Sequence, residues 1–329
     1  MMRYIRHIYI TKILLSLVFT LGLIGISTTP TLAADFELAI YPPLLRVNIK
    51  PGKNITQVFK IDNLSSEPKT LVARLIPFTD SDRFGNPILD PSFQAKWLEY
   101  FTLANSEIEL GKPFEIGAGQ SDQLIVSLAI PQSAPLKDLY ATLLISTYSN
   151  NIDTSLLGSN LKASIGSNLL ITVNNQLSPA TLLKIIDFAP EQGTYFKLGD
   201  IYVMDSITPS TFYATASNEG DFTAETKGLF KIQTASGKPI QLQSILPQYV
   251  IAGSQRKLIN GSSEDFNFTP SISLIGSFLA QIEIHSDNVN TSSQINIIFL
   301  PFKIIFGLAV GISLLLIIIN LSIKPIDNT

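Results

Sequence analysis

The sequence predicts an all-β protein, with two tandem β-sandwich domains between an apolar leader and an apolar carboxyl-terminal helix. Three observations support this class. Apolar and polar residues alternate with a period of two along many short segments between Ala34 and Phe299. Turn-forming Pro, Gly, Asn and Asp residues separate these segments. The two longest apolar stretches lie outside this region, one at each end of the 329-residue chain.

Residues 1–33 have the pattern of a secretory signal peptide. An apolar stretch from Ile13 to Ile26 follows a basic start, and Thr31-Leu32-Ala33 then supplies the small residues of a cleavage site. We expect cleavage after Ala33, with Ala34 as the alternative. An uncleaved anchor helix is the competing interpretation, and the short apolar core followed by Pro30 counts against it. The basic residues are Arg3, Arg6 and Lys12.

The first sandwich domain is expected at residues 34–175. Its strands each bury one face and expose the other, as strands of antiparallel sandwiches do. Pro51-Gly52 and Gly117-Ala118-Gly119 supply turns. One short helix is expected from Phe93 to Phe101, where aromatic residues recur at helical spacing. The alternating apolar residues are Ile55, Phe59 and Ile61; Leu71, Ala73 and Leu75; and Leu124, Val126, Leu128 and Ile130.

The second sandwich domain is expected at residues 176–300, with the boundary near Asn174 to Ser178. Each half is long enough to bury a core of its own. Short strands at this spacing, without long helices between them, favour immunoglobulin-like sandwiches. The expected strands of the second series contain Phe212, Ala214 and Ala216; Phe230 and Ile232; Ile240 and Leu242; and Phe278, Ala280, Ile282 and Ile284.

Residues 301–323 are expected to form a transmembrane helix. The stretch from Ile304 to Ile323 carries no charge and is long enough to cross a hydrocarbon layer of ~30 Å. With a cleaved leader, the chain crosses the plasma membrane once, with its bulk outside and residues 324–329 as a short cytoplasmic tail. Gly307 and Gly311 stand four apart, a spacing that allows close packing of two helices, so a homodimer through this segment is one hypothesis.

Composition excludes several functions. The chain has no cysteine and two histidines, His7 in the leader and His285, so disulfide scaffolds, cysteine–zinc sites, thiol nucleophiles and histidine clusters are excluded. The leader holds three of the 23 basic residues, which leaves 20 basic against 26 acidic residues in the mature chain and a net charge of −6. An acidic exported domain has no electrostatic reason to bind nucleic acid. We expect no cofactor, no metal and no catalytic residue.

Four features were weighed as functional sites. Asp80-Ser81-Asp82 begins like a calcium loop, but Phe84 and Pro91 stand where further ligands are needed, which favours a polar turn. Glu107 and Glu109 could pair for acid/base chemistry, and a solvated edge is the simpler interpretation. Trp97 is expected to fill the core rather than to bind a glycan. His285 is expected at the surface. No ligand-binding residue follows from the sequence.

Three stretches resemble domains of known bacterial surface proteins. Ala39 to Ile88 contains a proline pair, a Pro-Gly turn and a strand that ends in Asn, and Trp97 to Thr147 contains a Gly-rich turn and a strand that closes in Ile-Pro. Ala214 to Leu258 resembles a second domain of the same kind. Taken with the leader and the terminal apolar segment, this order resembles the WxL-interacting surface proteins of Gram-positive bacteria. The first domain also resembles the amino-terminal domain of PapD-type pilus chaperones.

This resemblance implies a partner, either another cell-surface protein or peptidoglycan. The chain departs from the family in its tail, where Lys324 is the only basic residue. We therefore expect a non-enzymatic, membrane-anchored bacterial surface protein that binds or scaffolds through strand edges and loop ends. The alternative is a chaperone or secretion-accessory protein that pairs an open edge strand with a client. A glycosidase is the third hypothesis, and it requires two carboxylates roughly 5–10 Å apart in a cleft.

Overall fold

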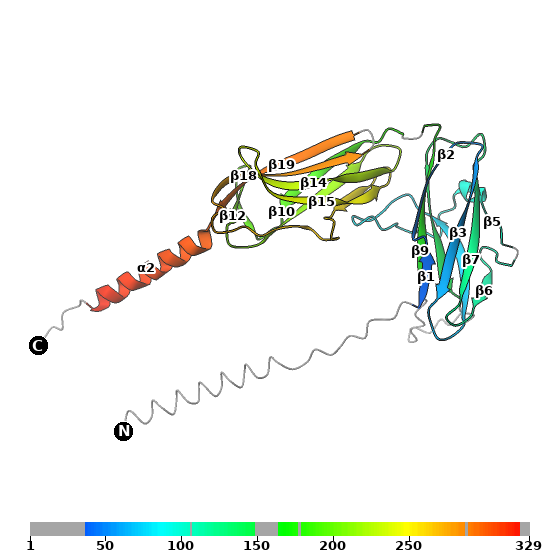
Figure 1. The fold of residues 1–329 in the computed structure, drawn as a ribbon, viewed down its shortest axis with the longest axis horizontal. Coiled ribbons are helices and arrows are strands. Elements are labelled where there is room, and N and C mark those ends of the chain that lie inside the picture. Colours follow the sequence, from blue (N-terminus) through cyan, green and yellow to red (C-terminus); the bar gives the residue numbers. More distant parts are fainter. Residues whose placement is uncertain (1–36, 106, 149–163, 177–178, 287–288, 323–329) are drawn as a thin grey trace, which may run out of the picture. The chain divides into compact units, whose positions relative to one another are not determined.

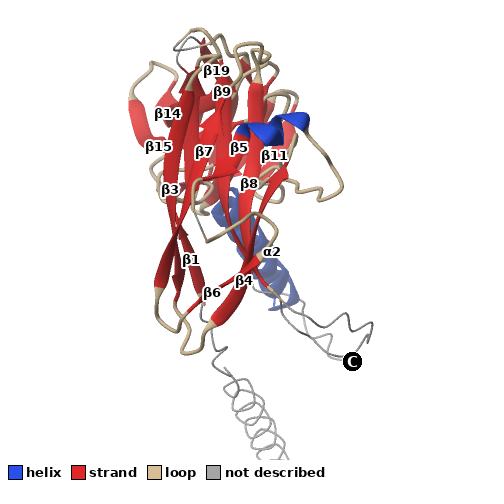
Figure 2. Ribbon diagram, turned by 90° about the vertical axis from the view of Figure 1, so that its right-hand side faces the viewer, coloured by secondary structure: helices blue, strands red, loops and turns tan. Residues whose placement is uncertain are grey.

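The structure is a computed structural model that describes residues 37–105, 107–148, 164–176, 179–286 and 289–322, with side chains of the last helix described up to Ile317. All elements described below belong to one compact unit, Leu38–Thr329. The predicted signal peptide, 1–33, and the predicted tail, 324–329, lie outside the described residues. The described chain is nearly all β, as predicted (Figures 1 and 2).

The first nine strands form two sheets (Figure 1). One sheet has the order β1 (Leu38–Tyr41), β3 (Asn54–Asn63), β7 (Ser121–Ala129) and β5 (Phe101–Leu103). The other has the order β2 (Leu44–Ile49), β9 (Ser164–Val173), β8 (Asp138–Thr147), β4 (Lys69–Pro77) and β6 (Pro113–Ile116). A 3-10 helix, η1 (Lys96–Tyr100), precedes β5. The expected short helix is thus present over five residues.

The remaining ten strands form a second pair of sheets. One contains β10 (Leu183–Pro190), β13 (Ser210–Asn218), β16 (Gln255–Leu258) and β17 (Phe266–Phe268). The other has the order β11 (Tyr195–Leu198), β12 (Ile201–Asp205), β19 (Val289–Leu300), β18 (Gly276–Ser286), β14 (Ala224–Thr234) and β15 (Pro239–Val250). The helix α2 (Phe302–Ser322) follows β19 after Pro301.

Each pair of sheets encloses its own hydrophobic core. In the first, the alternating residues of β3, β4 and β7 point inward as predicted, and Phe59, Leu71 and Leu124 are fully buried. In the second, Phe230 lies at the centre of an aromatic cluster, with ring centroids 5.0 Å from Phe266 and 5.3 Å from Phe212. Two separate cores explain why the period-two pattern occurs in two series.

One predicted inward residue faces outward. Leu242 is 56% exposed, whereas its neighbour Ile240 packs against the second core. In the pairing of β14 with β15, Gln241 lies opposite Ile232 and Pro239 lies opposite Gln233, so Ile240 is an extra residue. This bulge reverses the faces of the strand beyond it, which a strict alternation from Ile240 cannot anticipate.

The two sandwiches repeat one strand arrangement. β1 is antiparallel to β3 and β2 is parallel to the last strand, β9. In the second sandwich, β10 is antiparallel to β13 and β12 is parallel to the last strand, β19. In both, the central antiparallel pair of the second sheet, β8 with β4 or β18 with β14, follows the same order. The correspondence allows one sandwich to serve as a reference for the other.

A buried asparagine ends the equivalent strand in each sandwich. Asn63, at the end of β3, donates from Nδ2 to the carbonyls of Glu67 (2.8 Å) and Ile116 (3.0 Å). Asn218, at the end of β13, donates from Nδ2 to the carbonyls of Phe222 (2.8 Å) and Val250 (2.9 Å). Both asparagines are fully buried. Each asparagine therefore joins the end of its strand to the end of the edge strand in the facing sheet. We call this contact the asparagine clamp.

The predicted membrane span is not supported by the described residues. α2 covers the predicted segment, 301–323, except Pro301, which precedes the helix, and Ile323, which lies outside the described residues; its side chains are described from Phe302 to Ile317. Within the part of the chain that the structure describes, no helix combines the length and the hydropathy needed to cross a membrane.

Asn63→Ala and Asn218→Ala should each destabilise their sandwich. Each change removes the amide donor from a buried carbonyl, that of Ile116 or that of Val250, so we expect a loss of about 1–3 kcal/mol in the free energy of unfolding. Urea unfolding followed by intrinsic fluorescence measures this loss. Asn54→Ala, at the exposed start of β3, serves as the control and should change the free energy little. Equal effects of all three substitutions would contradict the clamp role.

Candidate functional site

The candidate calcium loop is a turn. Asp82 Oδ1 accepts the backbone N–H groups of Phe84 (2.8 Å) and Asn86 (2.9 Å), and Asp80 Oδ1 accepts that of Ser81 (2.7 Å). The bond from the Asn86 side chain to Asp82, followed by these backbone bonds, lowers the pKa of the Asp82 carboxyl. The carboxylates thus shape the loop. Among the described residues, no group of three or more acidic or histidine side chains could hold a metal ion.

The other candidates lie apart from one another. Glu107 and Glu109 are exposed in the irregular segment between β5 and β6, and Glu109 pairs with Lys112 at 2.7 Å. His285 is exposed, as predicted, and its Nδ1 lies 2.8 Å from Asn290 Oδ1. Trp97 is half-buried on η1 and packs against the first core, with its ring 6.2 Å from that of Phe101.

Gly307 and Gly311 both lie on α2. A Cβ atom added at either glycine would meet no described atom within 4 Å. The close-packing hypothesis therefore stays a prediction, because a partner helix is what it requires.

The groove that we assign as the candidate site runs along β4. β8 pairs with β4 from Leu71 to Pro77, whereas β6 pairs only with Lys69 to Val72. In the second sandwich, the equivalent strand β14 is paired with β15 from Ala224 to Gln233. The second half of β4 is therefore an open sheet edge. At the equivalent position of the second sandwich, the edge of β14 is covered by β15.

The backbone of Leu75 points out of this edge. The carbonyl of Thr70 accepts the N–H of Tyr148, and the N–H of Phe78 bonds to Tyr140, so even-numbered residues face β8. The carbonyl of Ala73 accepts the N–H of Gly111 on the opposite side (2.8 Å). Since backbone groups alternate along a strand, the N–H and C=O of Leu75 face the side away from β8. No loop or side chain of the described residues bonds to them.

Local sequence explains why β6 begins too late in the chain to cover this edge. Approaching β6, the chain makes a tight turn, in which the N–H of Lys112 bonds to the carbonyl of Glu109 (3.2 Å). Gly111 has φ +80°, which favours glycine over residues with a Cβ. Pro113 then begins β6, as proline commonly does at the first position of an edge strand. The segment before Gly111 consequently leaves the line of β4.

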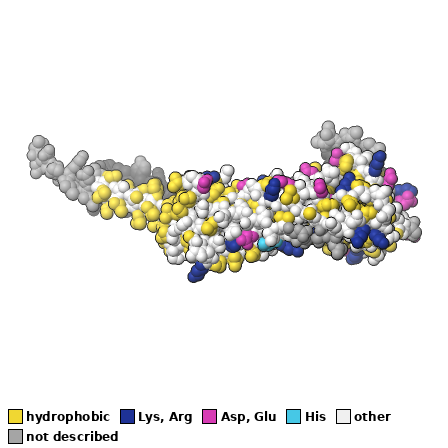
Figure 3. All heavy atoms as spheres, turned by 90° about the horizontal axis from the view of Figure 1, so that it is seen from above, with side chains coloured by type: hydrophobic (Ala, Val, Ile, Leu, Met, Phe, Trp, Pro, Cys, Tyr) yellow, Lys and Arg dark blue, Asp and Glu magenta, His cyan; other side chains and the backbone are white. Residues whose placement is uncertain are grey.

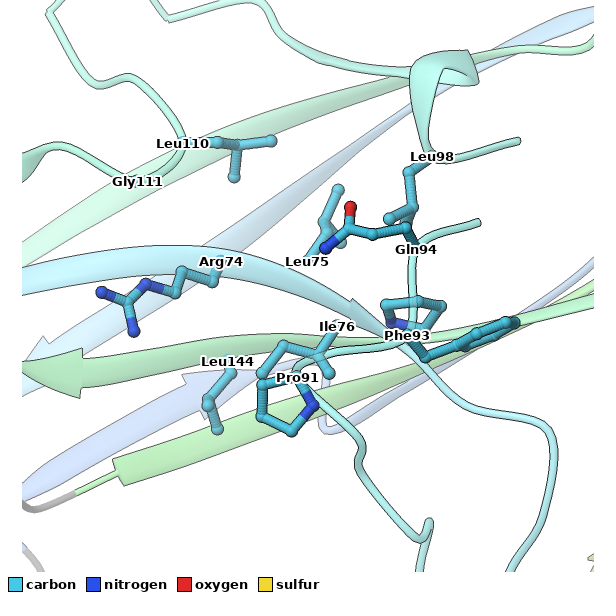
Figure 4. A pocket seen from close by; sticks show the side chains of 11 residues that line it. Arg74, Leu75, Ile76, Pro91, Phe93, Gln94, Leu98, Leu110, Gly111 and Leu144 are labelled. Carbon is cyan, nitrogen blue, oxygen red and sulfur yellow. The ribbon is translucent and has the colours of Figure 1, made fainter. Parts of the chain in front are cut away.

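The open edge borders a cavity of about 630 Å³ (Figure 4). It is a groove between the second half of β4, the segment from Pro91 to Leu98 and the turn at Gly111. On one side its apolar residues belong to the margin of the first core, and on the other they lie on the outer face of the sheet (Figure 4). The first set is Leu75, Leu98 and Leu110, and the second is Ile76, Pro91, Phe93 and Leu144.

The groove has one charged side chain. Arg74 is exposed on the outer face of β4, and no described residue forms an ion pair with it. Gln94 adds an amide. The arrangement therefore combines apolar surface, free backbone donors and acceptors, and a cation. The described residues that line it include no carboxylate and no nucleophilic side chain, and an apolar lining with a few polar groups is typical of a binding groove.

The other edges of the first sandwich are less open. β1 and β5 have four and three residues. β6 begins with Pro113. β2 carries Arg46, whose guanidinium lies 4.9 Å from the centroid of the Tyr249 ring and 3.6 Å from Glu225. Short strands, proline and charge are common ways of blocking an edge.

A second, polar cavity of about 390 Å³ lies over β10, β13 and β16. It contains the carboxylates of Asp187, Glu191 and Asp265, of which Asp265 pairs with Lys257 at 2.7 Å. Burial and then the charge of Asp187 raise the pKa of the Tyr213 phenol, which keeps it neutral. Sequence spacing did not select these carboxylates, since they come from strands and turns far apart in the chain.

One buried polar cluster is structural. The hydroxyl of Tyr140 donates to Asp138 Oδ2 (2.7 Å) and accepts the N–H of Ala252 (3.1 Å). Burial and then the Asp138 charge raise the pKa of the Tyr140 phenol above its usual value. Asp138 Oδ2 also accepts the hydroxyl of Thr223 (2.6 Å). The bonds to the Asp138 carboxylate all go to Oδ2, and Asp138 Oδ1 is buried with no hydrogen-bond partner among the described residues.

Comparison with known proteins assigns no family. No family model and no curated protein matches the chain. Among solved structures, the chain is similar to the E. coli chaperone DraB, with 14% identity and a TM-score of 0.34 over 79% of this chain and 95% of that one. The YadV chaperone has 11% identity and a TM-score of 0.35 over 79% and 100%. The Salmonella enterica SafB chaperone, solved with the SafA pilin, has 14% identity and a TM-score of 0.32 over 81% and 98%. At these values the likeness assigns no function.

The open edge predicts rapid hydrogen exchange at Leu75. Its N–H faces the groove, whereas that of Arg74 faces β8 and that of Leu71 is covered by β6. We expect the Leu75 amide to exchange at least about tenfold faster than either, because exposed strand amides open without unfolding. Amide exchange followed by NMR on the intact chain measures the rates. Protection of Leu75 equal to that of Arg74 would contradict the open edge.

Proposed function

We propose that this protein is a non-enzymatic binding protein that accepts a short extended segment of another protein beside β4. The observation that carries the proposal is the open backbone of Leu75 inside an apolar groove. An extended peptide is the ligand that can use both, because its backbone completes the sheet while its side chains fill pockets. A compact small molecule would leave the strand edge unused.

The geometry indicates what the bound segment contains. A residue opposite Leu75 would point toward Leu98 and Leu110 and would therefore be apolar. A residue opposite Arg74 would lie on the outer face beside the guanidinium, which favours an acidic side chain. Pro77 has no N–H to offer, so the free edge supports a short segment rather than a long strand.

This mode is the strand pairing of the chaperone or secretion-accessory alternative, limited to a few residues. A surface protein that scaffolds another through its strand edges would use the same contacts, as the resemblance to the WxL-interacting proteins implies. We favour a protein partner over a wall glycan, because the free groups of the groove are backbone groups of a strand. We also place the chain at the plasma membrane as a single-pass protein, with α2 as its anchor.

Support for the anchor comes from the composition of α2. Its described apolar side chains from Ile305 to Ile317 are exposed, and the segment from Ile304 to Ile317 carries no charge. The hydroxyl of Ser313 bonds back to the carbonyl of Ala309 (2.8 Å). A helix that is apolar on every face is typical of a lipid environment.

A short acetylated peptide of alternating valine and threonine, with one leucine and one aspartate, should bind the intact protein. Its copy with N-methylated amides along one edge cannot complete the sheet on that edge. Two such copies are made, one methylated on each edge of the peptide. The copy methylated on the edge that faces β4 should lose about tenfold or more in affinity, and the copy methylated on the opposite edge should bind as the unmethylated peptide does. Calorimetric titration measures both. Equal binding of the two methylated peptides would exclude strand addition.

The Arg74→Glu variant should bind this peptide more weakly than the unchanged protein does. A second peptide, in which lysine replaces the aspartate, should bind the variant with the original affinity. The reason is that the exposed charge acts across the added strand, where opposite charges pair favourably. Lys53→Glu is the matched control, since Lys53 is exposed in a turn outside the groove. If both charge reversals change the affinity equally, the effect is one of net charge and Arg74 does not contact the peptide.

The full-length chain should remain with the membrane fraction in alkaline carbonate, and a chain that ends at Leu300 should be released. The truncated chain keeps both cores, so it is expected to fold. Fractionation followed by immunoblotting distinguishes the two. Release of the full-length chain would show that α2 does not anchor it.

A further inference from the structure

Exposed isoleucines surround the point at which α2 leaves the second sandwich. Ile207 is 42% exposed in the turn after β12, and Ile272 and Ile275 are 59% and 57% exposed in the turn before β18. Both turns lie at the α2 end of the sheet, because Ser206 N–H bonds to the carbonyl of Leu300 and Gly276 pairs with Phe299. Turn residues are usually polar. Three exposed isoleucines at this end therefore indicate a surface that is covered by another molecule or by lipid.

The first turn of α2 is fixed to the same end. Lys303 Nζ donates to the Thr208 hydroxyl at 2.8 Å and lies 3.8 Å from the buried carboxylate of Asp205. The ring of Phe302 contacts that of Phe196 on β11, with centroids 5.2 Å apart. Phe196 is itself 64% exposed. The turns therefore hold a defined position beside the start of the helix.

The apolar surface of these turns continues into α2. Figure 3 shows hydrophobic side chains along the helix and over the adjoining end of the sandwich. Beyond Lys303, exposed apolar residues follow on successive faces of the helix, among them Ile305, Phe306, Leu308 and Val310. A protein partner would cover one face of such a helix. A lipid phase covers all faces, and it also reaches the turns at its base.

Charge at this end fits a lipid headgroup layer. Lys303 stands at the start of α2, and Lys238 lies in the hairpin between β14 and β15, which reaches the same end because Thr234 pairs with Phe278. Both lysines are exposed. Basic side chains beside apolar ones are the pattern of surfaces that lie in the interface of an anionic bilayer.

We propose that this end of the second sandwich rests in the interfacial layer of the bilayer, with Ile207, Ile272, Ile275 and Phe196 in contact with lipid. The inference rests on the membrane localisation proposed above and extends it from the helix to the folded domain. The sandwich is then seated on the membrane surface and held there by several turns. Without this contact, α2 alone would hold the sandwich at the membrane.

The absence of cysteine from the chain allows a direct test with single labels. Ile207→Cys, Ile272→Cys and Ile275→Cys are each labelled with an environment-sensitive nitrobenzoxadiazole dye, and the full chain is reconstituted into phosphatidylcholine and phosphatidylglycerol vesicles. Leu182→Cys is the control, since Leu182 is 46% exposed at the opposite end of the same sandwich, where its carbonyl accepts the N–H of Glu219. Nitroxide-labelled lipids serve as quenchers.

We expect blue-shifted emission and strong quenching by the nitroxide lipids at the three isoleucine positions, and neither at position 182. Emission at the three positions equal to the control would overturn the inference while leaving the anchor intact. A blue shift that nitroxide lipids do not quench would mean that protein covers the turns, and it would also overturn the inference. Failure of the chain to float with vesicles would remove the proposed localisation and the inference together.

Discussion

The rest of the structure depends on the buried asparagines Asn63 and Asn218. Each of them joins the end of a strand in one sheet to the end of the edge strand in the facing sheet. A strand that ends inside a sandwich leaves backbone carbonyls without partners, and an unpaired buried carbonyl is costly. Each asparagine supplies the missing donors and connects two facing sheets at the same place. Because the two clamps are equivalent, the edge strands that end at them, β6 and β15, can be compared directly.

That comparison identifies the candidate site. From the clamp of Asn218, β15 runs along the whole of β14, and the sheet edge is complete. From the clamp of Asn63, β6 covers only the start of β4, since the turn at Gly111 and the proline at 113 take the chain away. The result is an edge with free backbone groups over an apolar groove. A difference in the length of one strand thus separates a closed sheet edge from an open one.

Apolar surface has two different roles in this protein. Inside the sandwiches it is buried between sheets, and many of the strands that bury it alternate between buried and exposed residues. At the β4 groove and at the α2 end of the second sandwich it remains exposed, in the company of Arg74 and of Lys303 respectively. Exposed apolar surface beside a cation is suited to a partner with its own negative charge. At the β4 groove the partner that we propose is a peptide, and at the α2 end it is a lipid headgroup layer.

Alternation with a period of two determined the strands, their inward faces and the division into two series, because the burial of one face is a local property of each strand. The sequence also indicated that Asp80 and Asp82 form a turn and that His285 is exposed. The groove, by contrast, was decided by the tertiary structure alone. Which backbone edge stays open depends on where β6 ends relative to β4, two strands separated by some forty residues. Register between distant strands is set by packing and leaves no local pattern. The bulge at Ile240 shows that the hairpin of β14 and β15 also departs from strict alternation.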